Sequence, residues 1–482
     1  MQRWGNGIEF RRMDNVLRRL QPDSLGGVND AFLNFFRCPR EYGSFQLKGK
    51  LSGGERFFRF GAATCYGNSA TGISYVARPE SFDALEAIGF EDDRVLLCFN
   101  PTQAAENLRR ERYLSERSGG RWLRSLYYSV RPLLASPVRK AIQRLVLSRR
   151  LRERFPLWPV DCSVEEIFES MMVLLLRCKK EREVPFIWFW PEGHSSALMM
   201  THDVEDELGA TNCDMLMDLD DSVGLKAAFQ FVPEVRYDCF DRLIANVRER
   251  GFEANLHDLD HDGRLYDNLE RFRRRAKRIN EYAAKFRLNG FRAGAMHRNQ
   301  DWFHLLDFQY EMSVPNVSHS EPQRGGCCSV MPYFVGNLLE LPLTTVQDYV
   351  LFYILKEQSI DLWKRQIDSI VSHHGLISFI VHPDYIGRPT ERHLYRQLLR
   401  HLAELRDGRG IWCALPGEIN VWWRQRARLQ LIKEGDRWKI EGDGSERAKV
   451  AFACLEAGKL RYRIDEQTSL DTDERATANR VM

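Results

Sequence analysis

The chain has 482 residues, of which 44% are hydrophobic and 28% are charged, as in ordinary globular proteins. This length predicts roughly two or three domains with enough apolar material for a large core. The formal net charge of +3 at pH 7 gives no sign of a nucleic-acid-binding protein. No apolar run approaches the length that crosses a membrane, so an integral membrane protein is excluded as a class.

Cysteine usage and the N-terminal residues indicate the compartment. The eleven cysteines are odd in number and include no C-x-x-C pair, which favours reduced thiols over a disulfide framework. The opening sequence, MQRWGNGIEFRRMDN, lacks the apolar stretch of a signal peptide. We therefore expect a cytoplasmic protein.

After an N-terminal segment, residues 1–27, the next region (28–113) has the mixed pattern of an α+β domain whose role the sequence does not reveal. Strands are predicted in ERFFRFG (55–61) and RVLLCFN (94–100), and helices in SFDALEAIGF (81–90) and PTQAAENLRRERY (101–113). The Gly- and Ser-containing GAATCYGNSATG (61–72) is predicted to be a loop. We expect this domain to fold apart from the remainder of the chain.

Residues 114–184 form a basic helical connector. Between 114 and 154, arginines alternate with Leu, Val, Ile and Tyr at roughly helical spacing. The favoured interpretation is a helix packed on its neighbour with its arginines in water. The alternative is an amphipathic segment that associates peripherally with an anionic membrane, at its inner face.

From residue 185 to 428, apolar runs alternate regularly with helical patterns. The runs begin with PFIWFWP (185–191) and ALMMTHD (197–203) and end with LISFIVH (376–382) and GIWCALP (410–416). Helices are predicted between them, including 240–250, 265–288, 349–371 and 390–406. Repeated strand–helix units predict a parallel β/α barrel, whose active-site residues belong at the C-terminal ends of the strands.

The C-terminal part changes character. Short alternating runs with turns at 434–435 and 442–444 predict an antiparallel β module over 429–466. The remaining residues, 467–482, have the composition of a disordered tail.

Two acidic residues follow the apolar run at 197–200 and suggest a metal. Asp203 and Glu205 lie on one face of a strand, whereas Val204 points to the other face. Clustered carboxylates repel one another unless a cation joins them. Asp206 is an alternative ligand if the strand ends early.

Two histidines in EANLHDLDHDG (253–263) complete this candidate site. His257 and His261 are four residues apart, which places them on one face if the chain is helical there. One carboxylate and two imidazoles leave a coordination position open, as a hydrolytic metal centre requires. We expect a divalent metal, with zinc as the first candidate.

Four segments, in order, resemble the motifs of the polysaccharide deacetylase (NodB homology) family. They are THDVE (201–205), HDLDH (257–261), FRAGAMHRN (291–299) and FIVHPDY (379–385). The resemblance covers about half the chain and implies a distorted β/α barrel with metal-dependent removal of acetyl groups from N-acetylated sugars.

The same resemblance implies roles for individual residues. Asp203 would be the general base and His382 the general acid, with Asp384 a candidate to orient the imidazole. Arg292 would orient the base, and the metal ligands would be Glu205, His257 and His261.

The sequence departs from the family pattern at four places. An aromatic-rich motif that is usual before the last histidine is replaced by SVPNVSHSEPQRGGCC (313–328). The other three are single residues. Val204 stands where a second aspartate is common, Ala293 where a proline is usual, and Asp258 where Ser or Thr is common. Candidate substrate-binding residues are Arg324, which could contact an anionic group, and Trp302 and Tyr385, which could stack on sugar rings or serve in packing.

The sequence thus predicts a metal-dependent hydrolase that removes an N-acetyl group from an amino sugar in a polysaccharide or its lipid- or nucleotide-linked precursor. Its partner would be a carbohydrate and not a nucleic acid. The alternative is a catalytically degenerate barrel that binds glycan or scaffolds a polysaccharide-synthesis assembly. A glycosidase with Asp203 and Glu205 as its carboxylate pair is a weaker reading, because two residues on one strand face would flank a glycosidic bond unusually.

Overall fold

The computed structural model describes residues 26–51, 54–70, 82–114, 150, 153–179 and 181–465. The predicted N-terminal segment, most of the basic connector and the predicted tail lie outside these residues. Within the described part of the chain, no helix is both long and apolar enough to cross a bilayer.

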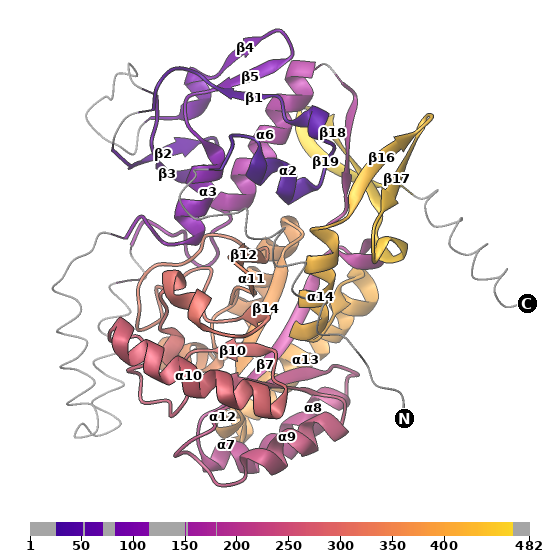
Figure 1. The fold of residues 1–482 in the computed structure, drawn as a ribbon. Coiled ribbons are helices and arrows are strands. Elements are labelled where there is room, and N and C mark those ends of the chain that lie inside the picture. The colour runs from indigo at the N-terminus through magenta and orange to yellow at the C-terminus, as the bar shows by residue number, and fades with distance from the viewer. Residues whose placement is uncertain are drawn as a thin grey trace, which may run out of the picture.

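One curved sheet occupies the centre of the molecule (Figure 1), with its strands in the order β12-β13-β11-β10-β9-β8-β7-β14. These strands are β7 (Ala197–Val204), β8 (Ala227–Phe231), β9 (Glu253–His257), β10 (Gly290–Arg292), β11 (Tyr310–Glu311), β12 (Tyr333–Val335), β13 (Leu338–Glu340) and β14 (Leu376–Val381). All neighbours run parallel except β12 and β13. The short β15 (Trp412–Cys413) pairs with Ala197 and Leu198 at the start of β7, and β8 pairs with the last five residues, from Met200 to Val204.

The two ends of the sheet are connected by side-chain hydrogen bonds between the segment after β13 and strand β14, and not by a strand ladder. Thr344 Oγ1 donates to the Leu376 carbonyl at 2.8 Å, and Thr345 Oγ1 donates to the Ser378 carbonyl at 2.7 Å. The sheet therefore curls into a barrel whose ladder is interrupted at this point. This architecture confirms the predicted distorted (β/α) barrel.

Helices cover the outside of the sheet. They are α7 (Glu207–Thr211), α8 (Cys213–Asp221), α9 (Phe240–Glu249), α10 (Leu269–Phe286), α11 (Asp361–Ser372), α12 (Pro383–Ile386), α13 (Pro389–Arg409) and α14 (Pro416–Arg426). Those predicted at 240–250, 265–288 and 390–406 are confirmed. The helix predicted at 349–371 is divided into a π-helical segment, Val350–Leu355, and α11, because Lys356 adopts a left-handed conformation that ends the first segment.

The N-terminal region contains α2 (Asp30–Phe36), α3 (Pro101–Arg109) and five short strands. These are β1 (Phe45–Leu47), β2 (Arg56–Phe60), β3 (Ala63–Gly67), β4 (Gly89–Glu91) and β5 (Arg94–Leu97). Two predictions were wrong here. The loop predicted at 61–72 begins as β3, which pairs with β2, and the helix predicted at 81–90 is a single 3-10 turn, Ala84–Ala87, followed by β4.

The segment predicted as the first barrel strand belongs to another sheet. β6 (Glu183–Ile187) pairs with β18 (Val450–Glu456), which in turn pairs with β19 (Lys459–Ile464). The predicted barrel start at 185 is therefore wrong, although the predicted antiparallel C-terminal strands, which include the hairpin β16 (Gln430–Glu434) and β17 (Arg437–Glu441), are present. An apolar run buried on both faces has the same sequence pattern in either sheet.

One hydrophobic core joins the N-terminal region to the rest of the molecule. It includes Phe36 of α2, Phe168 of α6 (Ser163–Lys179), Phe186 of β6 and Val450 of β18, and extends to Met199 of the barrel. Residues 28–113 thus do not form the separate unit that the composition predicted. Together these elements cover one end of the barrel, whereas α7 and α12 lie at the opposite end (Figure 1).

A candidate metal centre at the end of the barrel

Alternation along β7 separates the side chains of the candidate site from those that pack outside the barrel. Asp203 contacts Arg292 inside the barrel. His202, one residue earlier, points outward and contacts Asp220 of α8 at 2.9 Å. Val204 is likewise buried against the outer helices. Period-two alternation therefore directs Asp203 and the following Glu205 toward one site.

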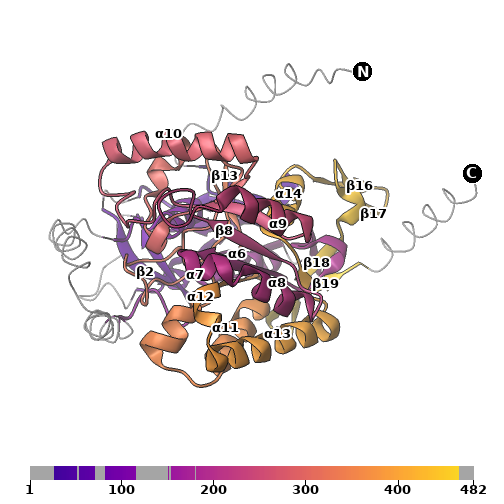
Figure 2. The ribbon, with the colours of Figure 1, turned by 90° about the horizontal axis from the view of Figure 1, so that it is seen from below.

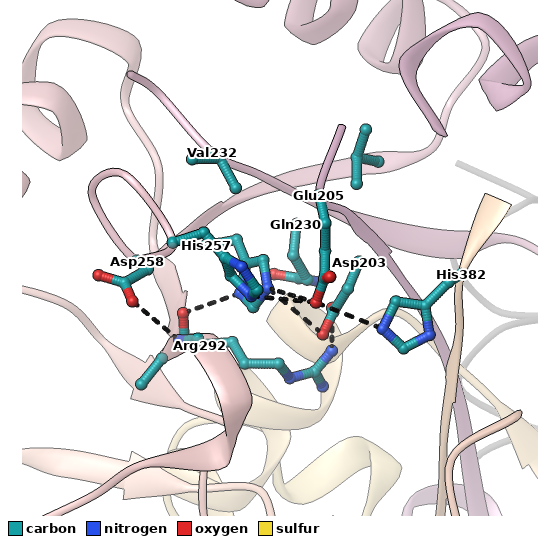
Figure 3. Close-up of polar contacts among 12 residues, drawn as sticks. Asp203, Glu205, Gln230, Val232, His257, Asp258, Arg292 and His382 are labelled. Carbon is teal, nitrogen blue, oxygen red and sulfur yellow. Dashed lines mark hydrogen bonds and ion pairs between the residues drawn. The ribbon is translucent and has the colours of Figure 1, made fainter. Parts of the chain in front are cut away.

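The three predicted metal ligands converge at the C-terminal ends of β7 and β9. Figure 3 shows two of them, Glu205 and His257. Glu205 Oε1 lies 3.0 Å from His261 Nε2 and 3.7 Å from His257 Nε2. One ligand atom from each residue lies within 4.8 Å of the others. One carboxylate oxygen and two imidazole nitrogens at this separation can share a single divalent cation.

The histidines reach this position from a strand end and from the loop after it, and not from the helix that their spacing suggested. His257 is the last residue of β9, and His261 follows in an irregular segment. Asp258 and His261 have φ values of 55° and 53°, which turn the chain sharply. The two imidazole rings consequently lie 4.8 Å apart, centroid to centroid.

Hydrogen bonding leaves both histidines ready to bind a metal. His257 Nδ1 donates to the Arg292 carbonyl at 3.1 Å, so its Nε2 lone pair faces the site. Both Nε2 atoms are buried, and among the described residues neither makes a well-aligned hydrogen bond, although the Glu205 carboxylate lies 3.0 Å from His261 Nε2 and 3.7 Å from His257 Nε2. Buried nitrogens without partners are uncommon in folded proteins. The donor set and its unpaired nitrogens therefore fit a divalent cation.

Asp203 is held as a carboxylate next to this centre. Its Oδ1 accepts a 2.6 Å hydrogen bond from Arg292 Nη1, and its Oδ2 lies 3.8 Å from His257 Nε2. Burial raises the pKa of Asp203, but Arg292, with help from His257 and His382, outweighs this effect and lowers the pKa. Asp203 is thus held in its ionised form.

Arg292 is fixed by the barrel interior. It is fully buried, and Nε donates to the Met312 carbonyl at 3.1 Å while Nη1 also donates to Thr201 Oγ1 at 2.8 Å. The missing proline after Arg292 does not disturb this arrangement. The Ala293 amide donates to Ser313 Oγ, and the Gly294 amide donates to Asp258 Oδ2.

His382 approaches the centre from the opposite side, at the end of β14. Its Nε2 lies 3.6 Å from Glu205 Oε1. Asp348 fixes the residue twice, because it accepts from His382 Nδ1 at 2.6 Å and from the His382 amide at 2.8 Å. Nε2 consequently points toward the metal ligands (Figure 3).

The prediction from the sequence did not include Asp348. It proposed Asp384 as the residue that orients His382. Asp384 lies in the first turn of α12, where burial raises its pKa to about 7. Asp348 follows the apolar run at 338–343, so the strand-end rule that found Asp203 could also have found it. Asp206, the alternative ligand, instead caps α7 by accepting from the Gly209 amide.

The three predicted substrate-binding residues have different surroundings. The Tyr385 ring lies 5.1 Å from the His382 ring and packs on Tyr349 and Tyr353, which the sequence did not single out. The Trp302 ring stacks on Tyr266 and contacts Phe272, a packing role. Arg324 is exposed and pairs with Glu153 at 3.0 Å.

Comparisons with known proteins identify structural neighbours but no sequence relatives. No protein-family model matches the sequence, and no curated protein matches it. Among solved structures, the chain is similar to a putative polysaccharide deacetylase from Mycobacterium smegmatis, with 19% identity over 49% of this chain and 93% of the other, and a TM-score of 0.40.

Two further structures have comparable similarity. A probable polysaccharide deacetylase from Pseudomonas aeruginosa PAO1 is 11% identical, with 48% and 91% of the two chains covered and a TM-score of 0.37. Puue allantoinase is 12% identical, with 49% and 92% covered and a TM-score of 0.39. Polysaccharide deacetylases are thus among the proteins to which this chain is similar, and the sequence motifs resemble the same family.

Proposed function

We propose that the protein is a metal-dependent hydrolase that removes the N-acetyl group of an amino sugar in a polysaccharide or its precursor, with zinc as the metal. One observation carries the proposal. The candidate ligands Glu205, His257 and His261 have a carboxylate on one side and a histidine on the other. The carboxylate is Asp203, which Arg292 holds in place, and the histidine is His382, which Asp348 holds in place. Amide hydrolysis needs such a pair, a base that activates the attacking water and an acid that protonates the leaving amine.

The first side prepares the nucleophile. A divalent cation bound at this centre would act as a Lewis acid toward the acetyl carbonyl and toward water. Asp203, kept ionised by Arg292, accepts the proton of the attacking water. Because Arg292 is buried and always charged, it holds the Asp203 carboxylate in one orientation throughout the reaction.

The second side serves the leaving group. An amine leaves poorly without a proton, so an acid must stand near the nitrogen of the scissile bond. His382 presents Nε2 to the centre while its Nδ1–H is held by Asp348. Asp348 fixes the ring and stabilises its protonated form, as the carboxylate of a catalytic triad does.

The aromatic side chains beside His382 support a sugar as the group that carries the amide. The rings of Tyr349, Tyr353 and Tyr385 lie within 5.9 Å of one another, centroid to centroid, and all three are partly exposed. Aromatic faces pack well against the apolar faces of sugar rings. The length of the glycan and its carrier are open to experiment.

The test is release of acetate by the zinc-loaded protein from N-acetylated oligosaccharides and from lipid- and nucleotide-linked N-acetyl sugars. We expect turnover on at least one of these substrates and its loss in Asp203→Asn with the metal retained. Stoichiometric zinc without acetate release from any of them would contradict the proposal. Glycan binding by such an inactive protein would support the degenerate barrel instead.

A further inference from the structure

Two glutamates are buried together on the outer side of the barrel sheet. Glu311 of β11 and Glu340 of β13 are register partners in the parallel ladder, so both side chains point to the same side of the sheet. Both residues are fully buried. This side faces the outer layer, because Phe291, the register partner of Glu311 on β10, packs in the same apolar cluster as Phe272 of α10. Figure 2 shows α10 along the outside of the barrel.

The two carboxyls share one proton. Burial, reinforced by the neighbouring Glu311, raises the pKa of Glu340 well above its usual range. Glu340 Oε1 accepts from the Val314 amide at 3.0 Å, which leaves Oε2 to carry the proton and donate to Glu311. Burial also raises the pKa of Glu311, but hydrogen bonds from Glu340 and Ser313 oppose this effect. Glu311 is therefore the member of the pair that keeps the negative charge.

Ser313 links the Glu311 carboxylate to the peptide between Arg292 and Ala293. Its amide donates to Glu311 Oε2 at 2.8 Å, and its Oγ donates to Glu311 Oε1. The same Oγ accepts from the Ala293 amide at 2.8 Å. The carbonyl of that peptide belongs to Arg292 and accepts from His257 Nδ1 at 3.1 Å (Figure 3). An unbroken chain of hydrogen bonds thus runs from the carboxyl pair to a candidate metal ligand.

Such a chain acts on the His257 imidazole in two ways. It fixes the Arg292 carbonyl, and this carbonyl sets the orientation of the ring. It also polarises the peptide, because a strong acceptor at the N–H end increases the partial negative charge on the oxygen at the other end. The bond from Nδ1–H becomes stronger as a result, and Nε2 becomes a better ligand.

We propose that Glu311, with Glu340 as its proton-bearing partner, is a positioning residue that acts through Ser313 and the Arg292–Ala293 peptide to orient His257 and strengthen its binding of a divalent cation. The effect concerns metal binding. That the bound metal serves deacetylation rests on the proposed function.

The molecule contains a matched control for this chain of hydrogen bonds. The Met331 amide donates to Ser329 Oγ at 3.3 Å, and Ser329 Oγ donates to the buried Glu165 at 2.5 Å. The order of groups is the same, from a backbone amide through a buried serine to a buried glutamate. Met331 packs in the core that joins the N-terminal region to the barrel, so this chain does not lead to the metal centre.

The test compares Ser313→Ala with Ser329→Ala in the full chain, with zinc affinity measured by competition with a chromogenic chelator. We expect Ser313→Ala to bind zinc roughly tenfold more weakly, as for loss of an outer hydrogen-bond partner of a ligand, and Ser329→Ala to stay near wild type. Zinc affinity that is unchanged in Ser313→Ala, or reduced equally in both variants, would overturn the inference.

Two isosteric variants keep the inference testable if Ser313→Ala folds poorly. Glu311→Gln leaves a single acceptor for the two donors of Ser313, so it should weaken zinc binding as Ser313→Ala does. Glu340→Gln still offers a donor to Glu311 and should have the smaller effect. The opposite order would overturn the inference. In the metal-free protein, the Nδ1–H proton resonance of His257 should shift in Glu311→Gln and not in Ser329→Ala; an unshifted resonance would count against the hydrogen-bond chain.

Failure of this inference can be separated from failure of the proposed function. Acetate release by the wild type, together with wild-type zinc affinity in Ser313→Ala and Glu311→Gln, would contradict only the inference. Zinc binding that weakens in both of these variants, in a protein that releases no acetate, would support the inference and contradict only the proposed function.

Discussion

Two buried arginines, six residues apart in the chain, show how an ion pair in the candidate site differs from one that only joins two parts of the fold. Arg298 pairs with Glu111 and joins the N-terminal region to the barrel. Its Nε, Nη1 and Nη2 all donate, and both Glu111 oxygens accept. Arg292 pairs with Asp203, but its Nη2 has no partner among the described residues.

The two ion pairs differ in whether the carboxylate has an oxygen left to contact a substrate or a metal. Both oxygens of Glu111 are occupied, since Oε1 also accepts from the Gly326 amide. Asp203 uses Oδ1 for Arg292, and its Oδ2 faces the histidine ligands. A satisfied buried pair stabilises a packing arrangement, whereas a partly satisfied pair keeps a group available for substrate or metal. The predictions below test this contrast, beginning with the largest effect.

Arg298→Met should lower the free energy of unfolding by about 3–5 kcal/mol, because it leaves the buried Glu111 carboxylate without its cation. The double variant Arg298→Met with Glu111→Leu should recover much of the loss. Urea unfolding followed by circular dichroism measures both. A loss below about 1 kcal/mol in the single variant would show that this pair is not structural.

His257→Ala should reduce metal affinity by more than roughly a hundredfold, since it removes a ligand and not merely a ligand's hydrogen-bond partner. His304→Ala, an exposed histidine outside the site, is the control. Elemental analysis after dialysis against a weak chelator measures the outcome. Full metal retention by His257→Ala would refute the ligand assignment.

Asp203→Asn should reduce turnover by roughly a hundredfold or more while the metal is retained. It should lose less stability than Arg298→Met, because asparagine still offers Arg292 a hydrogen-bond acceptor. Asp206→Asn is the matched control, because asparagine serves as well as aspartate at a helix N-cap. Acetate release measures turnover, and thermal unfolding measures stability. If Asp203→Asn unfolds as readily as Arg298→Met while keeping its turnover, the contrast between the two pairs is wrong.

Asp348→Asn should lower turnover by roughly ten- to a hundredfold, since it keeps a hydrogen-bond acceptor for His382 Nδ1 but removes the charge that stabilises protonated His382. Asp384→Asn should remain near wild type. The same acetate assay distinguishes the two carboxylates. The reverse order of effects would restore the sequence-based choice of Asp384.

Glu165 extends the comparison to a buried carboxylate that forms no salt bridge with an arginine of the described residues. It accepts from Ser329 Oγ at 2.5 Å, and burial raises its pKa to about 7, above the ordinary value of 4.5. The folded state therefore binds the extra proton between these values, and stability falls as pH rises from about 4.5 to 7.

Glu165→Gln should remove this contribution to the pH dependence. Its stability relative to wild type should increase toward neutral pH, by on the order of 1–3 kcal/mol, because wild type alone must bury an ionised carboxylate there. Unfolding midpoints at pH 5 and pH 7.5 measure the change. A difference between the two proteins that does not vary with pH would contradict the raised pKa.

The sequence by itself determined the parts of the site that depend on short-range rules. Alternation along a strand placed Asp203 and Glu205 on one face, whatever the strand's neighbours. The strand-end rule for barrels placed His257, Arg292 and His382 at a common edge. Motif resemblance added their expected roles, and the three candidate ligands do meet.

Only the tertiary structure decided which distant residues complete those groups. Asp348 orients His382 from 34 positions away by accepting from its Nδ1. Asp384, although it lies near enough to feel the charge of His382, makes no hydrogen bond to the imidazole among the described residues. Likewise, β6 pairs with β18 across more than 260 positions of sequence. A local sequence pattern predicts that a strand or a carboxylate is buried. It does not predict which strand or hydrogen-bond donor pairs with it, because the packing of the whole chain determines that partner.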